Sequence, residues 1–126
     1  MKLQESAENY LETIFMLSLA GGHVRSVDVA TELEYSKPSV SIAMKNLREN
    51  GYISVSPDGN ITLTELGQKI AQSMYERHML ISDWLIFLGV DKKNAVADAC
   101  KMEHTMSELS FAAIKKHIEE WKKGLR

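Results

Sequence analysis

This sequence of 126 residues has a single cysteine, no long apolar run and almost no excess charge. One cysteine excludes an internal disulfide and fits a reducing compartment. No stretch is long and apolar enough to span a bilayer, and residues 1–5 lack the apolar core of a secretion signal. We therefore expect a cytoplasmic protein. The net charge of -2 argues against a protein that coats nucleic acid without selectivity, but it allows a local basic surface.

Motifs of the common enzyme classes are also missing. We find no nucleophile elbow, no glycine-rich phosphate loop and no dedicated general base. Internal repeats, low-complexity segments and flexible linkers are absent as well. A hydrophobic content of 44% in 126 residues fits one globular domain, or a small domain with an extension. We therefore expect a protein that is not an enzyme.

The N-terminal half of the chain predicts three helices. Apolar residues recur at roughly helical spacing over residues 5–19. Ser26 is placed to cap a short helix over residues 27–33. After a three-residue turn, Ser36 is placed to cap another helix over residues 37–50. A short helix, a tight turn and a second helix are the elements of a helix-turn-helix motif.

Two short, β-branched runs follow, at residues 52–55 and 61–63. The segment between them, 56–60, has the sequence Ser-Pro-Asp-Gly-Asn, which strongly favours a hairpin turn. A helix-turn-helix followed by a β-hairpin is a winged helix.

The rest of the chain predicts three more helices. Thr64 caps a long helix that ends near Gly89, and Asp91 caps the next helix. A last helix covers residues 107–121. The fold class we expect is mainly α with a small β-hairpin: a winged helix-turn-helix followed by a helical dimerisation domain.

We place the winged-helix DNA-binding domain at residues 1–64 and the helical metal-binding and dimerisation domain at residues 65–126. The apolar faces of the C-terminal helices exceed what a small winged helix needs to cover. A dimer interface is the usual use of such a surplus, and an intramolecular core is the alternative.

The exposed side of the 37–50 helix has the composition of a DNA-binding surface. Residues at the start of a recognition helix reach base edges in the major groove, whereas later cations more often contact phosphates. Pro38 can offer only an apolar contact, most naturally to a thymine methyl group. The predicted DNA-binding residues are Ser36, Lys37, Pro38, Ser39 and Ser41 near bases, and Lys45 and Arg48 on the backbone. The alternative at each position is a helix cap or a solvated surface residue.

A thiol, a carboxylate and an imidazole share one face of the helix predicted over residues 94–105. Cys100, Glu103 and His104 stand at positions i, i+3 and i+4. This mixture of ligands suits iron, cobalt, nickel or zinc better than magnesium or calcium. The alternative is a surface Glu-His pair beside a small, half-buried cysteine.

With these elements in place, the chain resembles the diphtheria toxin repressor and manganese transport regulator family of metal-dependent repressors. The resemblance covers nearly the whole chain. Its motifs are Asn9-Tyr-Leu-Glu-Thr-Ile-Phe-Met-Leu17, Tyr35-Ser-Lys-Pro-Ser-Val-Ser41, Leu63-Thr-Glu-Leu-Gly67, Arg77-His78, Gly89-Val-Asp91 and Ala99-Cys100-Lys-Met-Glu103-His104-Thr-Met-Ser107. The resemblance implies a repressor whose metal corepressor favours the conformation that fits operator DNA.

The same resemblance implies a set of metal ligands. The matching positions are Asn9, Glu12, His78, Cys100, Glu103 and His104. Cys100 is similar to the iron-responsive branch of the family and Glu12 to the manganese-responsive branch. Asn9 departs from both, because the manganese branch has a carboxylate there and the iron branch a methionine. The implied cofactor is a divalent transition metal, Fe(II) or Mn(II), with zinc, cobalt or nickel also expected to bind in vitro.

We therefore expect a homodimer that binds a palindromic operator in double-stranded DNA and controls metal homeostasis, with no membrane partner. Two other functions stay open. One is a winged-helix regulator that senses an organic ligand or a thiol oxidant through Cys100. The other is a metalloenzyme that uses the same three side chains, which would leave the recognition helix unexplained.

Overall fold

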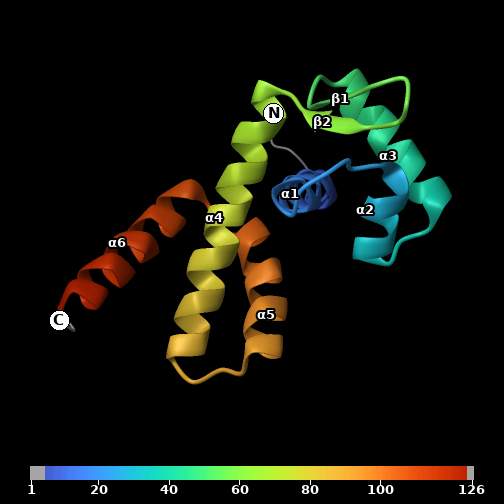
Figure 1. The fold of residues 1–126 in the computed structure, drawn as a ribbon. Helices are drawn as coiled ribbons and strands as arrows, with labels where there is room; N and C mark the ends of the chain where they lie inside the picture. The colour runs from blue at the N-terminus through green and yellow to red at the C-terminus, as the bar shows by residue number, and fades with distance from the viewer. Residues whose placement is uncertain (1–4, 125–126) are drawn as a thin grey trace. The chain divides into compact units, whose positions relative to one another are not determined.

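The computed structural model describes residues 5–124, which form helices and one β-hairpin (Figure 1). The elements are α1 (Glu5–Leu19), α2 (Ser26–Leu33), α3 (Lys37–Glu49), β1 (Ile53–Val55), β2 (Ile61–Leu63), α4 (Glu65–Phe87), α5 (Lys92–Thr105) and α6 (Glu108–Gly124). This order confirms the predicted class, mainly α with a small hairpin. None of these helices is long and apolar enough to cross a membrane.

The chain divides into two compact units, residues 1–75 and residues 76–126, and the boundary falls inside α4. The first unit contains α1, α2, α3, the hairpin and the first part of α4. The second contains the rest of α4 with α5 and α6. Each unit is described by itself below.

The helix-turn-helix of the first unit is formed by α2 and α3. Ser36 caps α3, as predicted, since its hydroxyl oxygen accepts a hydrogen bond from the Ser39 N–H at 3.3 Å. The prediction that Ser26 caps α2 is wrong by one residue. The N-cap residue is Arg25, whose N–H donates to the Asp28 carboxylate at 2.9 Å. The side-chain hydrogen bond at this end of α2 is therefore accepted by the acid in the first turn and not by a serine hydroxyl.

The wing is a two-stranded antiparallel hairpin in which Ile53 pairs with Leu63 and Val55 with Ile61. Two hydrogen bonds attach it to the segment before α2. The Ile61 N–H donates to the Val24 carbonyl at 2.7 Å, and the Val24 N–H donates to the Asn60 side-chain oxygen at 3.0 Å. The hairpin is therefore held by the rest of the winged helix as well as by its own register.

The core of the first unit gathers side chains from all of its elements. Leu11, Ile14, Val29 and Val40 are fully buried, and Ala71 brings the first part of α4 into the same cluster. Burial of a large apolar side chain contributes about 1.5–3 kcal/mol. Because α1 supplies a continuous run of buried residues from Tyr10 to Phe15, it is the central element of this unit.

The second unit is a small helical assembly in which α5 returns alongside α4 (Figure 1). Asp91 caps α5 as predicted, and the helix begins at Lys92 rather than at residue 94. The last helix runs to Gly124, three residues beyond the predicted end at 121. Ile81 of α4 and Ile118 of α6 are each 1% exposed, so this unit has an apolar core of its own.

A close approach of α4 to the wing generates a prediction about stability. Gly67 lies so near the residue before β1 that a Cβ atom there would overlap the backbone carbonyl oxygen of Tyr52. Backbone atoms cannot rotate away, so Gly67→Ala should destabilise the protein by about 1–3 kcal/mol. Urea unfolding measures the change.

Gly124→Ala is the matched control, because nothing lies within 4 Å of the added methyl group. It should leave the free energy of unfolding unchanged or raise it slightly. Equal unfolding midpoints for the parent and Gly67→Ala would contradict the close approach.

Candidate metal centre and DNA-binding surface

The local structure of α5 determines which of its side chains are buried. Asp91 accepts a hydrogen bond from the Asn94 N–H at 3.1 Å and starts the helix. Ala95, Ala99 and Glu103 then follow at intervals of four residues and form its buried face. Two small side chains allow close packing along this face, and the third residue of the face is a carboxylate. Glu103 is thus an ionisable group at a core position.

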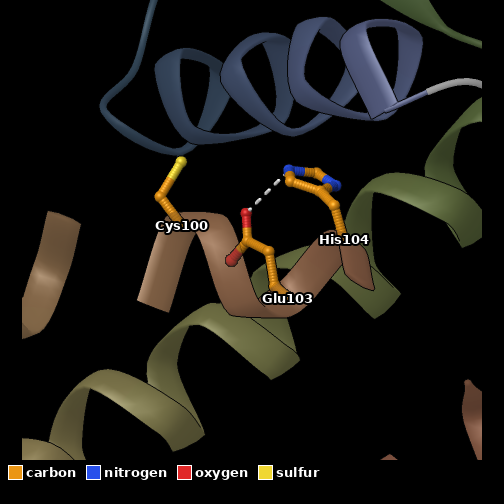
Figure 2. A group of neighbouring side chains, drawn as sticks. All are labelled: Cys100, Glu103 and His104. Atoms are coloured by element: carbon orange, nitrogen blue, oxygen red, sulfur yellow. Dashed lines mark ion pairs between the residues drawn. The ribbon is translucent and has the colours of Figure 1, made fainter. Parts of the chain in front are cut away.

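Cys100, Glu103 and His104 project together from the last turns of α5, as their spacing predicted (Figure 2). Their sulfur, oxygen and nitrogen atoms lie within 4.8 Å of one another. Cys100 is half-buried, and the His104 side chain is only 2% exposed. The alternative of a surface Glu-His pair is therefore wrong for these two residues.

The Glu103 carboxylate lies between two imidazoles. It has no exposed surface, and its Oε1 lies 3.2 Å from Nε2 of His104. Its Oε2 lies 3.1 Å from Nδ1 of His78, which comes from α4. The two histidines thus meet different oxygens of one carboxylate, and residues 25 positions apart in sequence come into direct contact.

This donor set fits a first-row divalent metal. A buried carboxylate needs a positive charge beside it, which either protonated imidazoles or a metal cation can supply. Ligand atoms that stand about 2.1 Å from one ion lie roughly 3 Å apart when adjacent, which is close to the observed nitrogen–oxygen separations. With a thiol close by, the group combines the ligand types of transition-metal sites.

The two remaining predicted ligands, Asn9 and Glu12, stand one turn apart on α1, in the first unit. The Glu12 side chain is buried at 4% exposure, and Asn9 is half-buried. The Asn9 main-chain carbonyl accepts a hydrogen bond from the Thr13 hydroxyl at 2.8 Å. The participation of these two residues in metal binding stays a prediction.

Arg77 is a buried cation that sequence analysis did not single out except as part of a motif. It is 5% exposed, and its Nη1 donates to the main-chain carbonyls of Glu103 and Met106. A signal was present in the sequence. Arg77 stands seven residues after Ile70 and four before Ile81, on the apolar side of α4, where a cation must find buried acceptors.

The seven predicted DNA-binding residues all lie exposed on or beside α3. They are Ser36, Lys37, Pro38, Ser39, Ser41, Lys45 and Arg48. The opposite side of the helix carries Val40, Met44 and Leu47, which are buried in the first unit. The Ser36 hydroxyl also donates to the Ser39 hydroxyl at 2.8 Å, so these two serines form a cap as well as part of the surface.

The tip of the wing is acidic. The Asp58 carboxylate accepts hydrogen bonds from the Ser56 hydroxyl and from the Asn60 backbone N–H. Both bonds lower the pKa of Asp58 below its usual value, and the bond from Ser56 has the larger effect. Asp58 therefore keeps its negative charge at neutral pH and repels phosphates. The tip of the wing itself therefore offers no positive charge to DNA.

Comparison with known proteins assigns both halves of the chain. Residues 2–61 match the N-terminal DNA binding domain of iron dependent repressors. Residues 64–123 match the metal binding and dimerisation domain of the same repressors. The two domains follow each other in the order expected from the sequence.

Individual relatives agree with this assignment. The chain is 37% identical over 110 residues to the transcriptional regulator MntR of Salmonella typhimurium, covering 87% of this chain and 70% of that protein. It is 32% identical over 108 residues to the iron-dependent repressor IdeR of Mycobacterium bovis, covering 85% of this chain and 47% of that one.

A solved structure of a manganese-dependent transcriptional repressor in complex with manganese superimposes with a TM-score of 0.82 at 26% identity. The match covers 90% of this chain and 52% of that one, so the chain spans about half the length of that repressor. The fold is therefore that of a winged helix-turn-helix followed by a helical dimerisation domain. On the two matched domains and the identity to MntR, this chain belongs to the iron dependent repressor family, the family of the diphtheria toxin repressor and the manganese transport regulator.

Proposed function

We propose that this protein is a metal-dependent transcriptional repressor that controls metal homeostasis in the cytoplasm, and that it is not an enzyme. The observation that carries the proposal is the fully buried Glu103 carboxylate, in contact with His78 and His104 and close to the Cys100 thiol. A repressor of this kind binds its operator tightly only when this group holds a divalent cation.

His78, Cys100, Glu103 and His104 hold the metal, and Asn9 and Glu12 on α1 complete the set. Glu12 is supported by its burial, because an ionised carboxylate with 4% exposure requires a compensating charge. Asn9 is supported by its position one helical turn before Glu12. A divalent cation held by these residues would supply positive charge to their carboxylates.

Fe(II) or Mn(II) is the physiological corepressor. The family match to iron dependent repressors and the similarity to MntR support this choice. Thiolate and imidazole ligands favour later first-row metals, whereas carboxylates accept manganese. Zinc, cobalt and nickel should therefore bind in vitro with higher affinity than the physiological metal, and affinity alone does not identify it.

DNA recognition uses α3. Ser36, Pro38 and Ser39 are exposed at its N-terminal end, where side chains reach base edges. Lys37 and Ser41 extend this group, while Lys45 and Arg48 contact phosphates. The acidic wing tip supports this assignment, since it offers no cation to the DNA backbone.

The protein acts as a homodimer on a palindromic operator. The division into a DNA-binding domain, residues 1–64, and a metal-binding and dimerisation domain, residues 65–126, is part of this proposal. A dimer must set the spacing of its two recognition helices to half-sites about 34 Å apart, roughly one helical turn of DNA. Holding the cation favours the conformation with that spacing, which is a population shift driven by differential binding.

The exposed residues of α3 generate a prediction about DNA binding. Lys45→Ala should weaken binding to all sequences alike, because one phosphate contact is lost. The slope of the logarithm of the binding constant against the logarithm of the salt concentration should become shallower by about one. Ser39→Ala should instead change the preference at one position in each half-site. Fluorescence anisotropy of labelled duplexes at several salt concentrations measures both effects.

Lys123→Ala removes another exposed lysine, at the end of α6, and serves as the control for charge. It should bind DNA like the parent. Equal affinity of the parent for operator and random duplex at every salt concentration would refute sequence-specific recognition.

The exposed apolar side chains of the second unit generate a prediction about assembly. Phe87, Leu88 and Leu109 are 56%, 57% and 85% exposed in the single chain, which favours burial against a second copy. We expect a dimer with and without metal. Sedimentation velocity at micromolar concentration tests this, and a monomer under both conditions would be the opposite result.

The contact between Glu103 and His104 generates a prediction about metal. His104→Ala removes an imidazole ligand, so metal affinity should fall by at least about 10-fold and the stimulation of DNA binding by metal should be lost. Weak, salt-sensitive DNA binding should remain, because α3 is untouched. Anisotropy of labelled operator, titrated with each metal and reversed with a chelator, is the measurement.

His117→Ala is the matched control, since it removes an exposed histidine on α6. It should respond to metal like the parent. If His104→Ala also responds like the parent, the metal site lies elsewhere.

A further inference from the structure

Arg77 and His78 are neighbours on α4, and both hold the same residue of α5. The Nδ1 atom of His78 contacts the Glu103 carboxylate at 3.1 Å. The Nη1 atom of Arg77 donates to the Glu103 main-chain carbonyl at 3.0 Å and to the Met106 carbonyl at 2.8 Å. Glu103 is therefore attached to α4 at its main chain and at its side chain.

The charge of Arg77 is accommodated by groups that attract a cation. The two carbonyls lie at the C-terminal end of α5, where the helix dipole is negative and carbonyls lack partners within the helix. The guanidinium carbon also lies 5.0 Å from the centre of the Phe111 ring, which belongs to α6. One buried side chain thus joins the end of α5 to both α4 and α6.

The consequence for the proposed metal ligands is geometric. Glu103 and His104 stand in the last turn of α5, and the ends of helices fray when their carbonyls lose their partners. Without Arg77, this turn would be free to shift relative to His78. A metal site requires its ligands to stay within about 0.5 Å of the binding geometry.

We propose that Arg77 is a positioning residue of the metal site, which sets the distance between His78 on α4 and the Glu103–His104 pair on α5. This inference rests on the proposed function in one respect, namely that His78, Glu103 and His104 bind a metal. The competing explanation is that Arg77 stabilises the fold and has no influence on how metal is bound.

The experiment compares Arg77→Met, Arg77→Lys and the control Lys115→Met with the parent, using the full chain. Lys115 forms an ion pair with Glu76 that also joins α6 to α4 but does not involve α5. Each protein is titrated with Co(II), whose visible absorption reports the number and geometry of its ligands. Circular dichroism and thermal unfolding of the metal-free proteins report the fold separately.

Arg77→Met should bind Co(II) about 10- to 100-fold more weakly than the parent, as is usual when a group that orients metal ligands is removed. Its absorption spectrum at saturation should also differ from that of the parent. Arg77→Lys should recover part of the affinity, because an ammonium group can still donate to these carbonyls. Lys115→Met should match the parent in affinity and spectrum.

A folded Arg77→Met variant with the affinity and spectrum of the parent would overturn the inference and leave the proposed function intact. Where Arg77→Met does not fold, Arg77→Lys decides: weaker affinity with an altered spectrum supports positioning, and parental values overturn it. Failure of the parent itself to bind Co(II) would overturn the proposed function and this inference with it.

Discussion

A carboxylate that has no exposed surface stays ionised only beside positive charge, and Glu103 is such a carboxylate. Its neighbours His78 and His104 are themselves nearly buried, with side chains 13% and 2% exposed. The packing of α5 on α4 thus encloses a group of ionisable side chains that needs positive charge, which protonated imidazoles or a metal cation can supply. The core of the second unit therefore contains an ionisable cluster as well as apolar side chains.

The first unit, residues 1–75, has an apolar core and an exposed polar helix face. Its core takes apolar side chains from α1, α2, α3 and the hairpin, and α3 contributes Val40, Met44 and Leu47 from one side, so that its other side can carry polar groups. Serines, a proline and Lys37 stand at the start of that helix, and Lys45 and Arg48 follow later, an order expected where base contacts come first and phosphate contacts afterwards. A net charge of -2 for the whole chain is compatible with this arrangement because Lys37, Lys45 and Arg48 all lie exposed on α3.

Periodicity predicted the parts of this structure that depend on one helix alone. The spacing of Cys100, Glu103 and His104 placed them on a common face, and the serine before α3 was correctly identified as its cap. Spacing could not predict that His78 meets Glu103, because the contact joins two helices and depends on how they pack. For that pair the resemblance to a known family supplied what the pattern of residues did not.

Arg77 was missed for the same physical reason. Its position on the apolar side of α4 shows that it is buried, but the acceptors lie 26 and 29 residues away, at the end of another helix. The cap of α2 was assigned to Ser26 because serine is the commoner cap, whereas Asp28 provides the hydrogen bond. Local sequence therefore predicts that a polar group needs a hydrogen-bond partner. It predicts less reliably which residue that partner is.

The most direct test of metal-dependent repression is DNA affinity measured across a panel of divalent metals. An operator is first selected from a pool of random duplexes, and its affinity for the protein is then measured with Mn(II), Fe(II), Co(II), Ni(II) and Zn(II), each with and without a chelator. The account predicts a rise of at least about tenfold, equivalent to 1.4 kcal/mol of coupling free energy, with one or more metals, reversed by the chelator. Equal affinity with and without every metal would contradict it.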